Sequence, residues 1–528
     1  MHLFAFAFVY SILIILYMKK LLLLILPFLF FTTKAQITFQ KTYGTADNEQ
    51  LGSMVKTTDG GFIMAGTNTN QNTAYVVKTD SNGVLQWTKK YESLYHLTAG
   101  TGISTTADDG YILTGTISDT NNHQRALLVK IKADGTFQWA KNYGDTAESG
   151  KQVKQTTDKG YIVIGNSGTY TSGIHVYVFK TDSTGALQWT QRISGNSDNS
   201  VNDGSDNGCS IMQTADGNFV LLATTFSHYA GSTQICVNKI NAVNGSQIWR
   251  SGYGPLIGFP YVSDFVQTPD KGFMILGTAI GGGNAKTFLI KTDTVGNRLW
   301  GKAYSDVYGT SLIQTLDSGF AFTGTYYSST NILVYKTKAD GTLQWAQSMG
   351  NVSSGYQSTP QTILQNSNQQ YIVGGHTSGF GAGQKDFYLL KTDELGSSHC
   401  NTLLISPTTV TVSFAADLYA TQDTLGTASV VILQTDTGGV ENTICYNIAG
   451  INQFTNNTQI KIYPNPANNK IIIDATDVVG VKLIDVLGNQ ILSTNQKNID
   501  VSNISNGVYF LNIKTNQGLA TKKIIIQH

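Results

Sequence analysis

Aromatic and histidine side chains recur in the segments that connect the short apolar runs of this chain. Beside amide and hydroxyl neighbours, such side chains could stack on sugar rings and bind the hydroxyl groups of a glycan. The candidates are Tyr95, His96, His123, Arg125, Tyr170, His175, His228, Tyr229, Phe259, Tyr261, Tyr326, Tyr327, Tyr356, His376 and Phe380. A second interpretation stays open, because many of the 26 tyrosines could simply cover the protein surface.

Carboxylates in the same connections support an alternative class, a secreted polysaccharide-degrading enzyme of the glycoside hydrolase or lyase type. A pair of Asp or Glu residues on either side of the bond is what glycoside hydrolysis requires. The candidates are Asp119, Asp145, Asp264, Asp306 and Asp386. A lone Asp in a loop is more often a turn residue. The chain also has no Gly-x-Ser-x-Gly, His-Glu-x-x-His, phosphate-loop or Cys-x-x-Cys motif, so the sequence favours a binding role over catalysis.

The longest of these loops, residues 195–208, contains Asp198, Asp203 and Asp206 among Asn and Ser residues. Oxygen-rich loops can bind Ca²⁺, but this spacing differs from the EF-hand pattern and no glutamate ends the loop. We therefore expect a solvated acidic loop and no cofactor. The formal net charge of +1 offers no electrostatic basis for binding nucleic acid.

Seven lysines at equivalent positions could form a cationic ring for an anionic ligand. They are Lys78, Lys130, Lys180, Lys239, Lys291, Lys336 and Lys391. Each lysine has an acidic or amide residue earlier in the same copy of the repeat. These residues are Asp59, Asp108, Asp158, Asp216, Asp270, Asp317 and Asn368. A lysine at the end of a strand can bury its stem and present its ammonium group to such a carboxylate. We expect structural ion pairs here rather than a ligand site.

The lysines belong to a phrase that occurs seven times between Gln36 and Cys400, with a period of about fifty residues. The first six copies end on the six tryptophans of the chain, Trp87, Trp139, Trp189, Trp249, Trp300 and Trp345. Each copy also has a small residue after its second apolar run, namely Gly66, Gly115, Gly165, Ala223, Gly277, Gly324 or Gly375. We expect these glycines to prevent crowding between adjacent repeats, and the tryptophans to fill the space between them.

Each copy contains four apolar runs that are rich in β-branched and aromatic residues and end at Asp-Gly or Asn-Gly turns. In the first copy the expected strands are residues 52–57, 61–67, 74–79 and 84–91. Four strands per repeat indicate the blade of a β-propeller. The last copy lacks its fourth strand, and residues 37–44 match it. The sequence therefore predicts an all-β protein with seven blades, the last closed by the N-terminal strand.

Two resemblances concern the repeat alone. The Asp/Asn-x-x-Gly-x-x-x-Trp stretches, such as residues 241–249, are similar to the repeats of quinoprotein-like and WD-repeat-like propellers. The quinoprotein enzymes have a vicinal disulfide, and no adjacent cysteines occur here. The resemblance therefore supports the fold but not the chemistry.

The four cysteines are consistent with an oxidising compartment. Cys400 ends the last repeat, and Cys445 follows 45 residues later, so we expect these two to form a disulfide. Cys209 and Cys236 fall on the first and third strands of the fourth repeat, which are not neighbours. For this pair we expect buried thiols.

The C-terminal segment contains an ordered series of short motifs. Its marker residues are Tyr463, Pro464, Asn465, Pro466, Asp485, Gly488, Gly507 and Tyr509. In motif order, residues 460–528 resemble the type A C-terminal sorting domain of the Bacteroidetes type IX secretion system. The resemblance implies a small β-sandwich that the outer-membrane machinery recognises and removes. It also implies that the body is then released or attached to surface lipopolysaccharide.

The N-terminus has the pattern of a secretory signal: two lysines after Met18, an apolar run to Phe31, and small residues up to Ala35. We expect translation to start at Met18. The expected organisation is a signal peptide (1–35), a propeller (36–400), an extension of uncertain fold (401–450), a linker (451–459) and a sorting domain (460–528). The expected location is secreted or outer-membrane surface, after transit through the periplasm.

Overall fold

The computed structural model describes residues 37–528 with internal gaps. The gaps are residues 93–96, 119–120, 122, 146, 170–172, 195–205, 230–231, 256–258, 282–283, 327–330, 351–356, 412–413, 418–420, 424–427, 432–433, 437–439, 449–460, 476–477, 486–489 and 516–517. Every regular element in the described part is a strand, so the expected all-β class is confirmed. No helix in that part is long and apolar enough to cross a membrane. The signal peptide expected at 1–35 lies outside the described residues.

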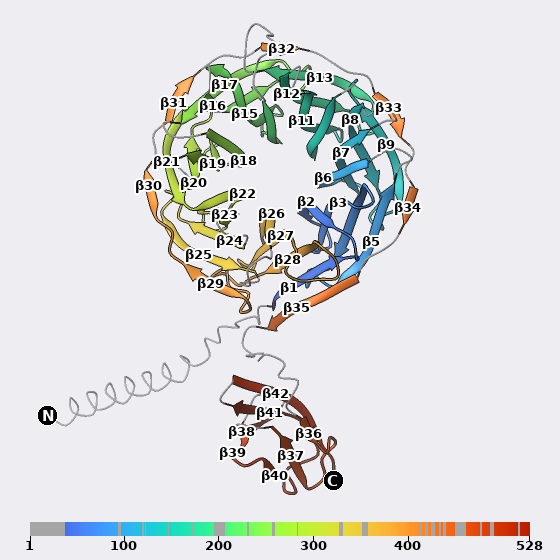
Figure 1. Ribbon diagram of the computed structural model, residues 1–528, viewed down its shortest axis with the longest axis vertical. Helices are drawn as coiled ribbons and strands as arrows, with labels where there is room; N and C mark the ends of the chain where they lie inside the picture. Colours follow the sequence, from blue (N-terminus) through green and yellow to red (C-terminus); the bar gives the residue numbers. More distant parts are fainter. Residues whose placement is uncertain are drawn as a thin grey trace, which may run out of the picture. The chain divides into compact units, whose positions relative to one another are not determined.

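The unit Ile37–Asn447 contains seven five-stranded sheets, which Figure 1 shows side by side in a ring. Sheet 1 contains β2 (Glu49–Lys56), β3 (Phe62–Asn68), β4 (Thr73–Thr79), β5 (Leu85–Glu92) and β34 (Gln434–Asp436). Sheet 2 contains β6 (Leu97–Thr105), β7 (Tyr111–Ser118), β8 (Gln124–Ile131), β9 (Phe137–Tyr143) and β33 (Ala428–Val431). Sheet 3 contains β10 (Glu148–Gln155), β11 (Tyr161–Thr169), β12 (Gly173–Thr181), β13 (Leu187–Ser194) and β32 (Thr421–Asp423).

The remaining four sheets follow the same order. Sheet 4 contains β14 (Asn207–Gln213), β15 (Phe219–Tyr229), β16 (Ser232–Ile240), β17 (Gln247–Pro255) and β31 (Phe414–Asp417). Sheet 5 contains β18 (Phe259–Gln267), β19 (Phe273–Gly281), β20 (Asn284–Thr292), β21 (Arg298–Ser305) and β30 (Thr409–Thr411). Sheet 6 contains β22 (Val307–Gln314), β23 (Phe320–Tyr326), β24 (Ile332–Thr337), β25 (Leu343–Met349) and β29 (Thr402–Ile405). Sheet 7 contains β26 (Ser358–Gln365), β27 (Tyr371–Thr377), β28 (Asp386–Lys391), β1 (Ile37–Gly44) and β35 (Val440–Ile448).

The N-terminal strand completes the last sheet, as the repeat alignment predicts. β1 pairs with β28, with Phe39 opposite Lys391 and Tyr43 opposite Phe387. On its other side β1 neighbours β35. Both edges of this strand are therefore covered, although β1 begins the unit and both of its partner strands come from the C-terminal part of the unit.

The segment between the repeats and the tail adds a fifth strand to every sheet. Its strands β29 to β35 join sheets 6, 5, 4, 3, 2, 1 and 7 in that order, each as the outermost strand. We call these seven strands the belt; they form the orange and red-orange rim in Figure 1. The sequence left the fold of this segment open. The belt covers the outer edges that would otherwise present unpaired backbone groups.

A β-bulge recurs in the first strand of every sheet and explains the repeated glycines. In sheet 1 the pairing shifts between Leu51 and Ser53, and Leu51 lies opposite Gly66. A Cβ on Gly66 would lie 2.0 Å from the Gln50 carbonyl oxygen of the same sheet, and a Cβ on Gly165 would lie 1.8 Å from that of Ser149. The glycines are therefore needed within each sheet. At Gly66 a Cβ would also lie 2.8 Å from the ring of Phe387 in sheet 7, so the expected crowding between adjacent sheets is present there as well.

Seven buried apolar clusters lie between neighbouring sheets, and one of them joins sheet 7 to sheet 1 through Phe39, Met54 and Phe387. The tryptophans contribute to these clusters as expected. Trp139, for example, lies against Tyr161 of the next sheet with the ring centroids 6.0 Å apart. Tyrosine hydroxyl groups add hydrogen bonds across the same junctions, and Tyr143 donates to the Gly185 carbonyl at 2.7 Å.

The second unit contains the C-terminal strands. One sheet contains β36 (Lys461–Tyr463), β37 (Lys470–Asp474) and β40 (Asn498–Asp500). The other contains β38 (Val478–Ile484), β39 (Gln490–Thr494), β41 (Gly507–Thr515) and β42 (Gly518–Ile526). A separate core fills this unit, with Ile471, Leu483 and Leu511 among its buried members.

Candidate functional site

The aromatic and histidine candidates do not form one described surface. His123 is exposed and Tyr261 is 43% exposed at the start of β18, whereas Tyr326 is half-buried. His175 and His376 lie within β12 and β27 and are only 7% and 6% exposed, so a ligand-binding role for them is not supported. Several candidates, or their side chains, lie outside the described residues, namely Tyr95, His96, Tyr170, His228, Tyr229, Phe259, Tyr327 and Tyr356.

The acidic loop before sheet 4 ends in a buried aspartate. Asp206 is 1% exposed, its backbone N–H donates to the Ile174 carbonyl at 2.7 Å, and its carboxylate lies 4.0 Å from His175 Nδ1. The expectation of a solvated loop is therefore wrong for Asp206, because this residue packs against β12. Asp198 and Asp203 lie outside the described residues. Within the described residues, no group of three or more His, Cys, Asp or Glu residues is arranged to hold a metal.

The repeated lysines pair with the repeated aspartates, as expected. Lys180 Nζ lies 2.7 Å from Asp158 Oδ2, and the other five pairs have distances of 2.6 to 2.9 Å. Partial burial acts to raise the pKa of Asp59, but hydrogen bonds from Lys78, Thr57 and Gly61 lower it to about 2. The seventh lysine, Lys391, instead donates to the Ser81 carbonyl at 3.0 Å.

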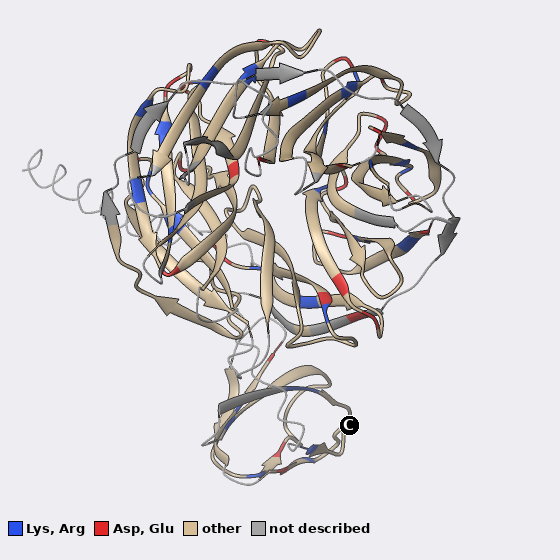
Figure 2. Ribbon diagram, turned by 45° about the horizontal axis from the view of Figure 1, so that its top comes forward, with Lys and Arg blue, Asp and Glu red and all other residues tan. Residues whose placement is uncertain are grey.

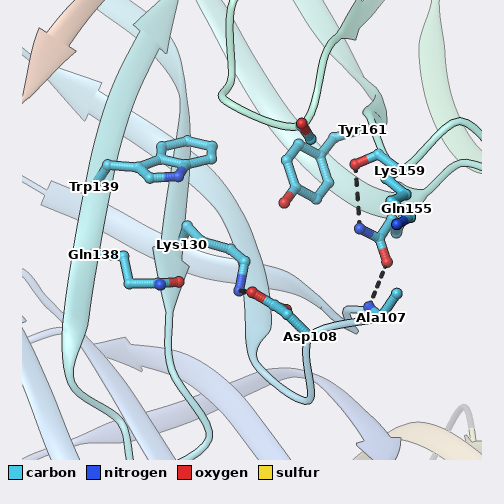
Figure 3. A pocket seen from close by; sticks show the side chains of 9 residues that line it. Ala107, Asp108, Lys130, Gln138, Trp139, Gln155, Lys159 and Tyr161 are labelled. Atoms are coloured by element: carbon cyan, nitrogen blue, oxygen red, sulfur yellow. Dashed lines mark hydrogen bonds and ion pairs between the residues drawn. The ribbon is translucent and has the colours of Figure 1, made fainter.

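A cavity of about 290 Å³ lies at one of these pairs, between sheets 2 and 3. Figure 3 shows Asp108 and Lys130 on one side and Tyr161 and Gln155 on the other. Gln155 accepts a hydrogen bond from the Ala107 N–H at 2.7 Å and so ties the two sheets together. Equivalent glutamines make the same contact elsewhere, as Gln213 does to Thr157 at 2.9 Å. This cavity is therefore part of the repeated scaffold.

Asp264 lies on a strand rather than in a loop. It follows the bulge of β18 and accepts hydrogen bonds from Ser311 Oγ at 3.1 Å and from the Leu312 N–H at 3.0 Å, both in sheet 6. Burial raises the pKa of Asp264, and these hydrogen bonds oppose the rise. Gln152 makes the equivalent contact to the Ile211 N–H at 2.6 Å. The side chain at this strand position therefore links neighbouring sheets, and in sheet 5 the residue at this position is an aspartate.

Two carboxylates do approach each other, at the junction of sheets 7 and 1. A Cβ built on Gly44 would lie 1.7 Å from Asp386 Oδ1 and 3.0 Å from Glu49 Oε2. Both residues are fully buried, so the pair has no access to a polysaccharide. Burial, and then the charge of Glu49, raise the pKa of Asp386 to about 6. The sequence placed Asp386 among the loop acids but gave no sign that Glu49 lies beside it.

None of the other candidate loop acids joins the Asp386–Glu49 pair. Asp145 is exposed and its backbone N–H donates to Glu148, whereas Asp306 has a positive φ of 61° and occupies a tight turn between β21 and β22. Asp119 lies outside the described residues. Figure 2 shows acidic and basic residues interspersed along the ribbon of the ring.

The first four marker residues of the tail lie on its surface next to the last strand. Tyr463 is 48% exposed, and Pro464, Asn465 and Pro466 are exposed as well. The Asn465 side chain accepts from the Ile525 N–H at 2.8 Å and donates to the Lys523 carbonyl at 3.1 Å, which fixes the motif to β42. Tyr509 is buried and its hydroxyl group donates to the Ser505 carbonyl at 2.8 Å.

The remaining markers are Asp485, directly after β38, and Gly507, the first residue of β41. Gly488 lies outside the described residues.

Residues 461–527 match the family model of the secretion system C-terminal sorting domain. The tail therefore carries an address for type IX secretion, which supports a secreted or cell-surface location and an interaction with that machinery. No curated protein matches the sequence.

Solved structures with a distant likeness include a Bacteroides caccae protein of unknown function, with 11% identity, a TM-score of 0.30, and coverage of 50% of this chain and 93% of that one. A second is Drosophila Semaphorin 1b, extracellular domains 1–2, with 5% identity, a TM-score of 0.38, and coverage of 68% and 87%. A third is an exotype rhamnogalacturonan lyase, with 11% identity, a TM-score of 0.33, and coverage of 68% and 73%. At these scores we draw no argument from the likeness.

Proposed function

We propose that this protein is a secreted or surface-attached seven-bladed β-propeller that binds glycans. The match of residues 461–527 to a sorting domain carries the extracellular part of this proposal. The seven sheets, with β1 in the last one, support the blade count and the closure by the N-terminal strand. A rigid ring with variable connections is a common scaffold for binding sites.

Delivery follows from the two ends of the chain. In this proposal, a signal peptide in residues 1–35 directs the chain to the periplasm, with translation starting at Met18. The type IX machinery then recognises the tail, removes it, and releases the body or attaches it to surface lipopolysaccharide. The exposed Tyr463 to Pro466 motif is available for such recognition.

A binding role is favoured over polysaccharide cleavage by the position of the carboxylates. Asp386 and Glu49 lie side by side but are fully buried, and Asp264 is engaged in links between sheets. Glycoside hydrolysis requires two carboxylates that reach the substrate. By contrast, Tyr261 presents a partly exposed ring at the start of an inner strand.

We also propose that a disulfide joins the two ends of the belt. Cys400 is disulfide-bonded and precedes β29, whereas Cys209 and Cys236 are buried free thiols, as expected. The fourth cysteine, Cys445, lies in β35 next to β1 and is our proposed partner. Such a bond would close the belt around the ring.

A glycan array probed with the mature protein tests the binding role. We expect defined surface glycans to bind, and Tyr261→Ala to weaken that binding by tenfold or more, since truncating an aromatic anchor of a binding site costs about 2 kcal/mol or more. The control is Val243→Ala, which removes an 85% exposed side chain from the turn between β16 and β17, at the opposite end of the strands. Absence of glycan binding, or equal loss in both variants, would refute the role.

A further inference from the structure

The junction between the first and last sheets contains an unusual concentration of buried oxygen atoms. Asp386 Oδ1 and Glu49 Oε2 lie 1.7 Å and 3.0 Å from one point, the position of a Cβ on Gly44. Both side chains have an exposed fraction of 0%. Two ionised carboxylates in this position would repel each other and lose their hydration, so a positive charge is required nearby.

Each carboxylate is held in place by its own loop. Asp386 Oδ2 accepts the N–H groups of Ala382 at 3.0 Å and Gly383 at 3.2 Å. Glu49 Oε1 accepts Thr45 Oγ1 at 2.5 Å and Asn68 Nδ2 at 3.0 Å. Glu49 Oε2 also accepts the Thr45 N–H at 3.2 Å, whereas Asp386 Oδ1 has no hydrogen-bond partner among the described residues. The two carboxylates are therefore positioned before any ligand arrives.

Further oxygens at this junction have no hydrogen-bond partner among the described residues. They are Asp386 Oδ1, the side-chain oxygen of Asn48, and the hydroxyl group of Tyr75. Asn48 directly precedes Glu49 and bridges to Lys385, which precedes Asp386. The Tyr75 ring lies 5.1 Å from that of Phe387, the residue after Asp386. Buried polar atoms in native proteins are normally satisfied, so this set indicates a missing partner.

The charges around the junction leave room for a cation. Lys90 Nζ lies 4.0 Å from the carboxylate of Asp47 and donates to Gln71 at 2.9 Å. Its charge also acts to lower the pKa of Glu49, but burial is the larger effect and the pKa of Glu49 is raised. The junction of sheets 2 and 3 offers an internal comparison. Arg125 of sheet 2 occupies the strand position that Asp386 occupies in sheet 7. Arg125 precedes Ala126, the partner of Tyr143, and Asp386 precedes Phe387, the partner of Tyr43. The equivalent strand position is therefore an arginine in sheet 2, where its side chain donates to the Asp145 carbonyl at 3.2 Å, and an aspartate in sheet 7.

We propose that Glu49 and Asp386 bind one Ca²⁺ ion across the junction of sheets 1 and 7, with the Tyr75 hydroxyl group beside it. Ca²⁺ takes oxygen ligands, including carboxylate and amide oxygens, in irregular geometries. A shared proton is the competing occupant, but it would neutralise only one of the two carboxylates. The ion would tie the N-terminal strand and the first sheet to the last repeat.

The test is thermal unfolding and metal content of the full chain. We expect one Ca²⁺ per chain in protein dialysed against CaCl₂, and a higher midpoint with Ca²⁺ than with a chelator at pH 7.5, because a ligand bound only by the folded state stabilises it. Mg²⁺ should raise the midpoint less, since it requires a stricter octahedral geometry.

Matched variants distinguish Ca²⁺ binding by Glu49 and Asp386 from a general effect of removing a buried carboxylate. Glu49→Gln and Asp386→Asn keep the side-chain shapes, and each should reduce the Ca²⁺ affinity by about tenfold or more. The control is Glu148→Gln, because Glu148 holds the equivalent loop by accepting the Asp145 N–H at 2.8 Å. This control should keep the full Ca²⁺ response.

Two outcomes would overturn the proposal. One is a wild-type protein that binds no Ca²⁺ and has the same midpoint with Ca²⁺ and with chelator. The other is a midpoint that depends on pH alone: the raised pKa of Asp386, about 6, makes the folded state bind the proton more tightly. The contribution of Asp386 to stability would then be greatest below pH 4 and would be lost as the pH rises through 6, with no response to Ca²⁺. Both measurements use the wild-type chain and remain informative if a variant fails to fold.

Discussion

At the residue scale, two buried tyrosines of the same apolar cluster differ in their hydrogen bonding. Tyr143 and Tyr177 are both fully buried in the cluster between sheets 2 and 3. The Tyr143 hydroxyl donates to the Gly185 carbonyl, whereas the Tyr177 hydroxyl has no hydrogen-bond partner among the described residues. The energetic value of the two hydroxyl groups must therefore differ.

This difference gives a paired prediction. Tyr143→Phe should lower the free energy of unfolding by about 1–1.5 kcal/mol, because a buried hydrogen bond is lost. Tyr177→Phe should be neutral or stabilising, because it removes a buried polar group that lacks a partner. Denaturant unfolding of the two variants measures both values. Equal losses would show that the hydrogen bond across the sheets has no specific role.

The Lys–Asp pairs predict sensitivity to acid. Against partial burial, hydrogen bonds from Lys180 and Thr156 lower the pKa of Asp158 below its ordinary 3.8. A carboxylate with a lowered folded-state pKa contributes stability above pH 4, and this contribution is lost as the pH falls through the folded value. We expect the free energy of unfolding to fall below pH 4, and to fall less steeply in Asp158→Asn. An unchanged slope in that variant would contradict the assignment.

The sequence predicted these pairs because the residues recur in register, and recurrence is the signal of a repeat. It could not predict the Glu49–Asp386 contact, because Gly44 and Asp386 become neighbours only when β1 joins β28. It also misjudged His175 and His376 as loop residues. Their strands extend further than the apolar runs indicate, which buries both rings.

At the element scale, the strands of the repeat were largely predictable and the belt was not. The expected first strand at 52–57 is observed as Glu49–Lys56, and the fourth, expected at 84–91, is Leu85–Glu92. Alternating β-branched residues and Asp-Gly turns determine such strands locally. The belt strands are three or four residues long in six sheets, so they lack a period of their own. They form because an unpaired edge is available in each sheet.

The proposed disulfide between the two ends of the belt should contribute strongly to the free energy of unfolding. Cys400→Ser should lower the free energy of unfolding by about 4 kcal/mol, from the closure entropy of the 45-residue segment that a Cys400–Cys445 bond would span. Denaturant unfolding measures the loss. The matched control, Cys209→Ser, removes a free thiol and should cost much less. Thiol labelling of the unfolded, unreduced protein should find two reactive cysteines, whereas four would exclude the bond.

At the scale of the whole molecule, the chain combines a ring of sheets with an export address. In the sequence, the repeats come first, the belt strands follow them, and the sorting domain comes last. The class and the repeat could be inferred from the sequence because they are periodic. The identity of a ligand could not, because binding depends on the non-repeated connections, and several of these lie outside the described residues.

The most direct test of the account is the location of the protein when the tail is absent. In the native host, we would compare the full chain with a chain that lacks residues 463–528, by cell fractionation and by protease treatment of intact cells. We predict that the full chain yields a body at the cell surface or in the medium, and that the shortened chain accumulates in the periplasm. Undiminished surface or extracellular protein from the shortened chain would contradict the central claim.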